Sequence, residues 1–292
     1  MKRLNIIGCG RAAGSLARLW LQAGTLQVGS VLNRSEKSTR AAVASLGAGM
    51  AATGPGAMGA AEYWLIGTGD DQIERAALAL RESGQDLSGA LVFHLAGRFG
   101  LGPLCPLHDR TALLAAMHPV RSLTHERLDL EDFAGTACVA EGSTQALEAL
   151  HPLVEAIGGT WLPVTDIHRG LYHAALAVVS NVTKAVTWKA QTWLQDAGLP
   201  EESAAEVTHQ LLRSTVDDLF RMGARQSITG PIIRGDTRTI EAHLEAVEAR
   251  NPDDLEIYRV LARIIVELAR DRGDLDAATL ARFEALLALR GA

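Results

Sequence analysis

Cysteine is scarce in this sequence, which also lacks a long uncharged apolar run and an excess of basic residues. The three cysteines among 292 residues, Cys9, Cys105 and Cys138, are too few and too scattered for a disulfide framework. Since no run of about 18 apolar residues is free of charge, a membrane span is not expected. The net charge of −6 argues against a surface for nucleic acid or an anionic membrane. The N-terminus shows no signal-peptide pattern, so we expect a reduced, cytoplasmic protein.

The composition that remains is that of a globular chain with room for two domains. It is 48% hydrophobic and 21% charged, and its length exceeds that of one average domain. The first half alternates short apolar β-type runs with helical segments, which indicates βαβ units around a mainly parallel sheet. After Thr165 only helical patterns follow, over residues 166–197, 201–224, 236–249, 252–272 and 276–289. We therefore predict an α/β domain over residues 1–165 and an all-α domain over residues 166–292.

The stretch "IIGCGRAAG" places Gly8 and Gly10 directly after a strand and before a helix. Glycines there permit a tight turn and close approach to a pyrophosphate, which lies at the positive end of the helix. A Gly-x-Gly pair alone is weak evidence, because glycine turns are common. Its position inside a βαβ unit is, however, the context that the motif requires. We predict a Rossmann-like dinucleotide site that includes both glycines, Arg11 and Ala12, although Arg11 can equally face solvent.

The second strand ends in "VLNRSEK", without the Asp or Glu that binds the ribose hydroxyls in NAD enzymes. Asn33, Arg34 and Ser35 stand there instead. A carboxylate would repel a 2′-phosphate, whereas a guanidinium can bind one with help from amide and hydroxyl donors. The pattern favours NADP(H), with an ordinary solvated turn as the alternative. A methyltransferase would carry an acid where Asn5 stands, and a flavoprotein would keep the ribose-binding acid, so both classes are disfavoured.

Ligands of open parallel sheets bind beyond the carboxyl ends of the strands. Thr68 and Gly69 end one strand, where small residues let a cofactor pass. His94 and His118 end two others, and each is either a substrate-binding group or a hydrogen-bonded structural histidine. Five residues of types that commonly bind metal ions lie in this part of the sequence: His94, Cys105, His108, His118 and His125. Their separations match no zinc spacing, so no metal site is predicted.

The stretch "YHAALAVVSNVTKAV", residues 172–186, is largely apolar but carries several polar side chains. Burying such groups costs free energy unless they find partners. On a continuous α-helix, His173, Ser180 and Lys184 fall on one stripe, with Asn181 at its edge. Reduction of a carbonyl or imine requires a proton donor in addition to hydride. We predict His173, which titrates near neutral pH, and Asn181 as catalytic residues and Ser180 as a substrate-binding residue. Alternatively, these groups satisfy one another or cap neighbouring helices.

The stretch "SITGPIIRGDTRTIEAHL" combines a Gly-Pro turn with a helix start at Asp236. Arg234, between them, is predicted to bind an anionic group of the substrate or a phosphate of the cofactor. A surface salt bridge is an equally acceptable interpretation of this spacing.

Together, "IIGCGRAAG", "HLAG", "MHPVRS", "YHAALAVVSN" and "TGPIIRGD" resemble a family of predicted oxidoreductases that join a Rossmann-like domain to a helical domain of unknown function. The layout is remotely similar to pyrroline-5-carboxylate reductase, ketopantoate reductase, and the 6-phosphogluconate and 3-hydroxyisobutyrate dehydrogenases. The resemblance implies an NADP(H)-binding N-terminal domain and a helical C-terminal domain that dimerises. One departure matters: the hydroxyacid dehydrogenases carry a catalytic Lys four residues before an Asn, and counting back from Asn181 reaches Ala177.

We therefore predict an NADP(H)-dependent oxidoreductase that transfers hydride between nicotinamide and a small carbonyl or imine substrate resembling a hydroxy or amino acid. Its expected partners are that small molecule and a second copy of the chain, with no nucleic acid and no membrane. A non-catalytic NADP(H)-binding sensor or regulatory protein is the alternative, motivated by Ala177. A purely structural dimer module is a third possibility, which any affinity for NADPH would exclude.

Overall fold

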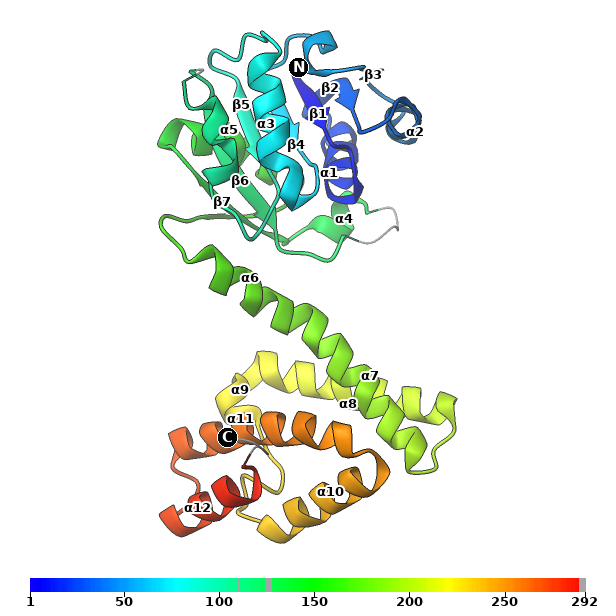
Figure 1. Ribbon diagram of the computed structural model, residues 1–292, viewed down its shortest axis with the longest axis vertical. Coiled ribbons are helices and arrows are strands. Elements are labelled where there is room, and N and C mark those ends of the chain that lie inside the picture. The colour runs from blue at the N-terminus through cyan, green and yellow to red at the C-terminus, as the bar shows by residue number, and fades with distance from the viewer. Residues whose placement is uncertain (110, 124–127, 289–292) are drawn as a thin grey trace. The chain divides into compact units, whose positions relative to one another are not determined.

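The chain divides into two compact units, Met1–Val182 and Thr183–Ala292 (Figure 1). The computed structural model describes residues 1–109, 111–123 and 128–288, so His125 lies outside the described residues. Within these ranges the first unit holds a sheet flanked by helices, and the second unit holds helices only. The predicted fold class, a mainly parallel Rossmann-like sheet followed by an all-α region, is confirmed. The first unit extends past residue 165 because the next helix contacts strands of the sheet.

The sheet has the strand order β3-β2-β1-β4-β5-β6-β7-β8. Its strands are β1 Lys2–Ile7, β2 Leu26–Leu32, β3 Met50–Ala51, β4 Tyr63–Ile66, β5 Leu91–His94, β6 Leu113–Pro119, β7 Ala137–Gly142 and β8 Thr160–Pro163. Neighbours from β3 to β6 are parallel, β7 is antiparallel to β6, and β8 is parallel to β7. The strand order runs outward from β1 to β3 on one side and from β4 onward on the other, so it reverses between β1 and β4. Ligands of this architecture bind at such a reversal point.

The register brings the ends of the parallel strands into one row. Ile7 at the end of β1 lies opposite Leu32 of β2 and Ile66 of β4, and Ile66 lies opposite His94 of β5. The segments that follow these strands therefore leave the same edge of the sheet side by side. They are the segments from which most of the candidate site residues come.

Helices cover both faces of this sheet (Figure 1). The helices of the first unit are α1 Arg11–Gln22, α2 Glu36–Leu46, α3 Ile73–Glu82, α4 Leu130–Phe133, α5 Thr144–Glu155 and α6 Arg169–Ala177. Leu16 and Trp20 of α1 share one core cluster with Leu150 of α5, whereas Ile73 and Leu80 of α3 belong to the cluster on the other face. The sheet strands are apolar on both sides for this reason, as expected for parallel strands covered by helices.

The second unit is held by a small core and by polar ties between helices. Its helices are α7 Thr183–Asp196, α8 Glu201–Met222, α9 Ala224–Ser227, α10 Thr237–Arg250, α11 Leu255–Arg272 and α12 Ala277–Leu286. Val266 of α11 and Phe283 of α12 are buried in the core. Asp254, just before α11, accepts hydrogen bonds from Lys189 Nζ at 3.0 Å and Trp193 Nε1 at 2.8 Å, both on α7. No helix among the described residues is long and apolar enough to cross a membrane.

The helix predicted over residues 166–197 is present over residues 169–196, with two local differences from the prediction. The first helix begins at Arg169, after His168 caps it by accepting from the N–H of Leu171. A π-helical turn, Val178–Val182, then replaces α geometry. Each π turn holds more residues than an α turn, so it changes the direction in which later side chains point. The single stripe predicted at 3.6 residues per turn therefore does not continue through Ser180 and Asn181, which lie in the π turn.

Candidate functional site

The glycine turn after β1 packs closely against the backbone that follows β4. Gly8 has φ +87°, in the left-handed region that favours glycine. A Cβ on Gly8 would lie only 2.5 Å from the backbone nitrogen of Thr68, which follows β4. Gly10 precedes α1 without a side-chain cap, so the start of α1 presents backbone N–H groups toward a ligand. Because the start of a helix is partly positive, this turn suits an anionic group.

Asn33 fixes the turn to the segment that follows β2. Its side-chain oxygen accepts a hydrogen bond from the backbone N–H of Cys9 at 2.7 Å, and its Nδ2 donates to the carbonyl oxygen of Ser38 at 3.0 Å. The backbone N–H of Asn33 donates to the hydroxyl of Thr39 at 3.0 Å. The amide of Asn33 is thus engaged by the protein, and its contribution is to position the glycine turn.

Cys9 lies within this turn, and burial raises the pKa of its thiol to about 11, against a smaller opposing effect of Arg18. The thiol is therefore protonated at neutral pH and does not act as a nucleophile there. This agrees with its interpretation as a small filler of the turn.

A cleft of about 700 Å³ opens beside the turn at the reversal point of the sheet. Its walls include six of the predicted cofactor-binding residues: Gly8, Gly10, Asn33, Arg34, Thr68 and Gly69. Three others do not line it: Ser35 caps α2, Ala12 packs against the core, and Arg11 borders a smaller hollow of about 220 Å³ between α1 and α2. A volume of this size accommodates part of a dinucleotide.

The far end of the cleft, near β2, carries positive charge and hydroxyl groups. Arg34 lines the cleft and has no ion-pair partner among the residues that the structure covers. Ser35 caps α2 by accepting from the N–H of Ser38 at 3.2 Å, and the two hydroxyls are 2.9 Å apart. Ser38, which the sequence did not single out, lines the cleft, whereas Ser35 does not. This end of the cleft therefore offers a guanidinium beside the hydroxyl of Ser38 in the first turn of α2.

Thr68 supplies a further sign that the cleft takes a polar ligand. Its hydroxyl oxygen is buried and has no hydrogen-bond partner. An unsatisfied buried hydroxyl costs free energy, and such groups in native proteins usually meet a ligand or water. Together with the glycine turn and the open helix start, it shows that the residues present fit a dinucleotide.

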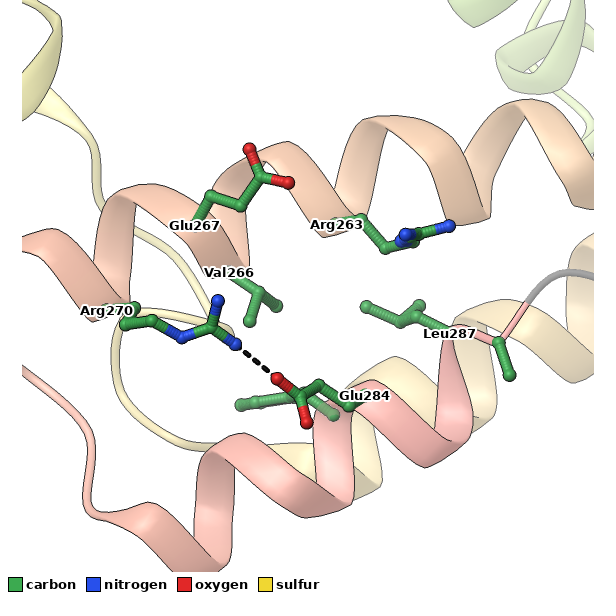
Figure 2. A pocket seen from close by; sticks show the side chains of 8 residues that line it. Arg263, Val266, Glu267, Arg270, Glu284 and Leu287 are labelled. Atoms are coloured by element: carbon green, nitrogen blue, oxygen red, sulfur yellow. Dashed lines mark hydrogen bonds and ion pairs between the residues drawn. The ribbon is translucent and has the colours of Figure 1, made fainter.

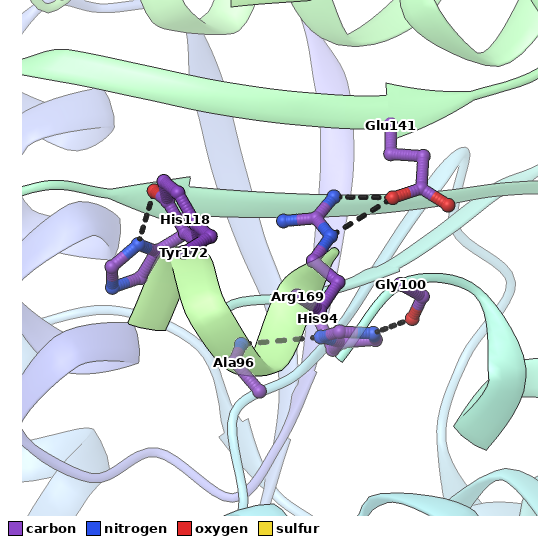
Figure 3. A network of polar contacts seen from close by, with 7 residues as sticks. All are labelled: His94, Ala96, Gly100, His118, Glu141, Arg169 and Tyr172. Atoms are coloured by element: carbon purple, nitrogen blue, oxygen red, sulfur yellow. Dashed lines mark hydrogen bonds and ion pairs between the residues drawn. The ribbon is translucent and has the colours of Figure 1, made fainter. Parts of the chain in front are cut away.

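A second group of polar side chains lies at the ends of β5 and β6 and on α6 (Figure 3). His94 is completely buried, and both its ring nitrogens are engaged by the backbone. Nε2 lies 2.9 Å from the carbonyl oxygen of Gly100, and Nδ1 accepts from the N–H of Ala96 at 3.1 Å. Burial lowers the pKa of His94, so its ring is neutral. These contacts give His94 the role of holding the loop after β5.

His118 is bound instead by a side chain. Its Nδ1 lies 2.9 Å from the hydroxyl of Tyr172 on α6, and its ring packs edge-on against the rings of Tyr172 and His173. Burial, followed by the nearby His173 and Arg169, lowers the pKa of His118 to about 4. A Cβ on Gly97 would lie within 3 Å of the His118 ring, so only glycine fits there. His118 is a neutral, firmly placed ring at neutral pH.

Arg169 connects α6 to the antiparallel strand β7. Its Nε and Nη2 donate to one oxygen of Glu141 at 2.9 and 2.5 Å. Its Nη1 is buried without a hydrogen-bond partner, and Figure 3 shows this nitrogen on the side away from Glu141, toward Tyr172 and His118. The guanidinium carbon lies 5.8 Å from the centre of the Tyr172 ring. A charged donor thus remains unsatisfied next to the His118–Tyr172 pair.

Most of the other predicted catalytic and substrate-binding residues are exposed. His173 and Asn181 are exposed, and the hydroxyl of Ser180 lies 3.3 Å from that of Ser122. Arg234 is exposed and belongs to the second unit, so its predicted part in the site stays a proposal. Within the described part of the chain, no three His, Cys, Asp or Glu side chains are grouped so that they could hold a metal ion.

The second unit has a cavity of its own, of about 430 Å³, between α11 and α12 (Figure 2). Val266, Phe283 and Leu287 form its apolar wall, and an ion pair joins Arg270 to Glu284 across it. None of the residues predicted for the site lines this cavity. It is a gap at the edge of the helical core.

The fold and the row of ligand-facing strand ends define the class of this protein: a Rossmann-like α/β unit joined to a helical unit. Solved structures share it. An imine reductase from Myxococcus stipitatus in complex with NADP⁺ has a TM-score of 0.64 and 18% identity, covering 96% of this chain and 99% of that chain. A pyrroline-5-carboxylate reductase from Coxiella burnetii has a TM-score of 0.58 and 15% identity, with 98% of each chain covered. A Thermotoga maritima protein has a TM-score of 0.71 and 22% identity, covering 92% and 99%.

At these low identities, the TM-scores show that the chains share a fold. Residues 136–265 match a family model described as a domain of unknown function, DUF2520. The resemblance inferred from the sequence, a Rossmann-like domain joined to a domain of unknown function, is thus confirmed. No curated protein matches the chain in sequence.

Sequence reasoning missed several residues that the structure places at the site: Arg75, Ser38, Arg169, Glu141 and Tyr172. Tyr172 is the first residue of the stretch 172–186, directly before His173, and Arg169 lies one helical turn before His173. Glu141 and Arg75 carried no signal of their own, because only the fold brings them to the strand ends.

Proposed function

We propose that this protein is an NADP(H)-dependent oxidoreductase that transfers hydride between nicotinamide and a small carbonyl or imine substrate. The observation that carries the proposal is the cleft at the reversal point of the sheet. It combines a glycine turn, an uncapped helix start, an unsatisfied Thr68 hydroxyl and Arg34. The fold shared with NADP-linked imine reductases supports the same reaction class.

Different residues along the cleft would bind different parts of the cofactor. The pyrophosphate lies over Gly8 and Gly10 at the start of α1, and the 2′-phosphate lies at Arg34 and the start of α2. The path along the ends of β4 and β5 then leads toward His118 on β6. When bound, the cofactor supplies hydride. The chain's own residues supply the binding surface, the orientation of the substrate and a proton.

The proton comes from the His118–Tyr172 pair in this proposal. Reduction of a carbonyl or imine places charge on oxygen or nitrogen, which a positioned hydroxyl can neutralise. Tyr172 can give its proton to that atom and take another from solvent, while Nδ1 of the neutral His118, 2.9 Å away, holds the hydroxyl in place. His173 makes no hydrogen bond within the residues described and is the competing donor. Asn181 and Ser180 are proposed to orient the substrate.

We further propose that the protein acts as a homodimer through its helical unit. Exposed apolar side chains gather on α8, including Leu211 at 66% and Phe220 at 85% exposure. An apolar groove of about 730 Å³ also runs along α7, α8, α10 and α11, and Leu211 lines it. Apolar surface of this extent on a water-soluble chain marks an interaction site. A second copy of the chain would cover it.

Binding calorimetry tests the proposal, with NADPH compared with NADH on the wild type and on Arg34→Ala. We expect the wild type to bind NADPH more tightly and Arg34→Ala to lose that preference. Lack of NADPH binding by the wild type would refute the proposed function. Consumption of NADPH in the presence of small keto acids and cyclic imines then tests turnover.

A sensor or regulatory role is the second candidate, favoured by Ala177 where hydroxyacid dehydrogenases carry a catalytic Lys. It predicts tight NADPH binding with no oxidation across that panel. It also predicts that Tyr172→Phe leaves every measurable property of the complex unchanged.

A further inference from the structure

Arg75, in the first turn of α3, lines the same cleft as Arg34. It comes from the other side of the cleft, after β4, whereas Arg34 follows β2. No ion pair or hydrogen bond engages either guanidinium within the described ranges. Of the nearby carboxylates, Glu36 pairs with Arg40 and Asp71 accepts from the side chain of Gln72, whereas among the described residues Asp70 and Glu74 make no ion pair with Arg75. Two unneutralised cations thus border one cleft.

Arg75 is a cation in the first turn of α3, next to the acidic Glu74. A cation in the first turn opposes the positive end of the helix, whereas a cation in the last turn is favoured. The same helix shows the favourable case, because Arg81 lies in its last turn and pairs with Asp109 at 2.5 Å. Arg34 lines the same cleft and carries the same charge. A ligand with two negative charges would neutralise both cations.

We propose that Arg34 and Arg75 bind the 2′-phosphate of NADP(H) jointly, one from each side of the cleft. This inference rests on the proposed function and adds the second residue that sets cofactor choice. Ser38 and Gln72 line the cleft between them and can donate further hydrogen bonds. Ala76 and Ala79, on the following turn of α3, leave an apolar wall on which the adenine can lie.

The test is calorimetric binding of NADPH and NADH to Arg75→Ala, with Arg81→Ala as the matched control on the same helix. A charge-assisted contact to phosphate predicts that Arg75→Ala weakens NADPH binding at least about tenfold. NADH binding should change less than about twofold, since the lost partner is absent from NADH. Arg81→Ala should leave both affinities unchanged. Arg75→Lys should retain part of the preference, because it keeps the charge without the bidentate geometry.

A second readout needs no cofactor. Removing a cation from a helix start should leave the melting temperature of ligand-free Arg75→Ala equal to or above that of the wild type. Unchanged NADPH affinity in Arg75→Ala, or an equal loss for NADPH and NADH, would overturn the two-arginine assignment. Either result leaves the proposed function standing as long as the wild type binds NADPH. Failure of the wild type to bind NADPH would refute the proposed function itself.

Discussion

Tyr172 and His118 form one of two nearly identical histidine–tyrosine pairs in the described part of the chain. The Tyr172 hydroxyl lies 2.9 Å from Nδ1 of His118, with the rings 5.8 Å apart at 86°. In the helical unit, the Tyr258 hydroxyl lies 2.7 Å from Nδ1 of His243, with the rings 5.8 Å apart at 87°. Only the first pair lies beside the carboxyl ends of the parallel strands. The second pair is therefore a built-in control for the chemistry assigned to the first.

We expect Tyr172→Phe to lower kcat about 100-fold with little change in KM, because the variant keeps the ring and loses the transferable proton. Tyr258→Phe should leave both constants nearly unchanged. Steady-state kinetics of the two variants and of His173→Ala measure this. If His173→Ala, and not Tyr172→Phe, abolishes kcat, the proton comes from His173.

The pH profile of the reaction should follow His118. Its pKa is lowered to about 4, so the ring stays neutral from neutral pH down to about pH 5 and becomes protonated near pH 4. A protonated ring cannot accept from Tyr172, and kcat should fall on the acid side near that pH. An acid limb near 6.5, the ordinary histidine value, would indicate that a group other than His118 controls the rate instead.

Gly8→Ala should be more harmful than the same change at Gly24, although both glycines have positive φ. At Gly24 nothing lies within 4 Å of an added Cβ, so only backbone strain of about 1–2 kcal/mol is expected. At Gly8 the Cβ also meets the Thr68 backbone at 2.5 Å, which adds about 1–3 kcal/mol of overpacking. Denaturant unfolding measures the difference. Equal losses would show that the two strand ends can separate.

Asp254 should stabilise the helical unit in a pH-dependent way. Hydrogen bonds from Trp193 first, and then Lys189, lower its pKa below the ordinary value of 3.8. A carboxyl group whose pKa is lowered on folding contributes stability above its unfolded pKa and loses it as the pH falls through the folded value. Asp254→Ala should therefore lower the melting temperature at pH 7 but much less near pH 3. Asp196→Ala, which removes an exposed ion pair with Arg250, is the control and should have little effect.

Phe220→Asp should weaken self-association if the exposed face of α8 is the dimer interface. Burying a phenylalanine side chain contributes about 1.5–3 kcal/mol, and a charge in its place would have to be desolvated. Sedimentation velocity over a range of concentrations measures the dissociation constant. Leu78→Asp, at an exposed apolar residue of the first unit, should leave it unchanged. A monomeric wild type at all concentrations would contradict the proposal.

The parts of the fold that depend on local pattern were readable from the sequence. Apolar strands, helix stops and the glycine turn act over a few residues, and the structure follows them closely. The short strand β3 left no such pattern, because two residues bury no periodic face. The π turn was also invisible, since the Val, Ser and Asn that form it are equally compatible with an α-helix.

The candidate site was predictable only where it follows directly from a strand end. The cleft contains Gly8, Arg34 and Thr68 because parallel strands end at one edge. The partner of His118 was not predictable, since it depends on how α6 returns to β6. Arg169 meets Glu141 only because β7 runs antiparallel to β6, a direction that the sequence of β7 does not encode.

The protonated thiol of Cys9 in the glycine turn has a practical consequence. Burial also raises the pKa of Cys138, to about 12, so both it and Cys9 resist maleimides at neutral pH. Cys105 alone is exposed among the three. A fluorophore can therefore be attached to the unmutated chain at a single known position, with no engineered cysteine.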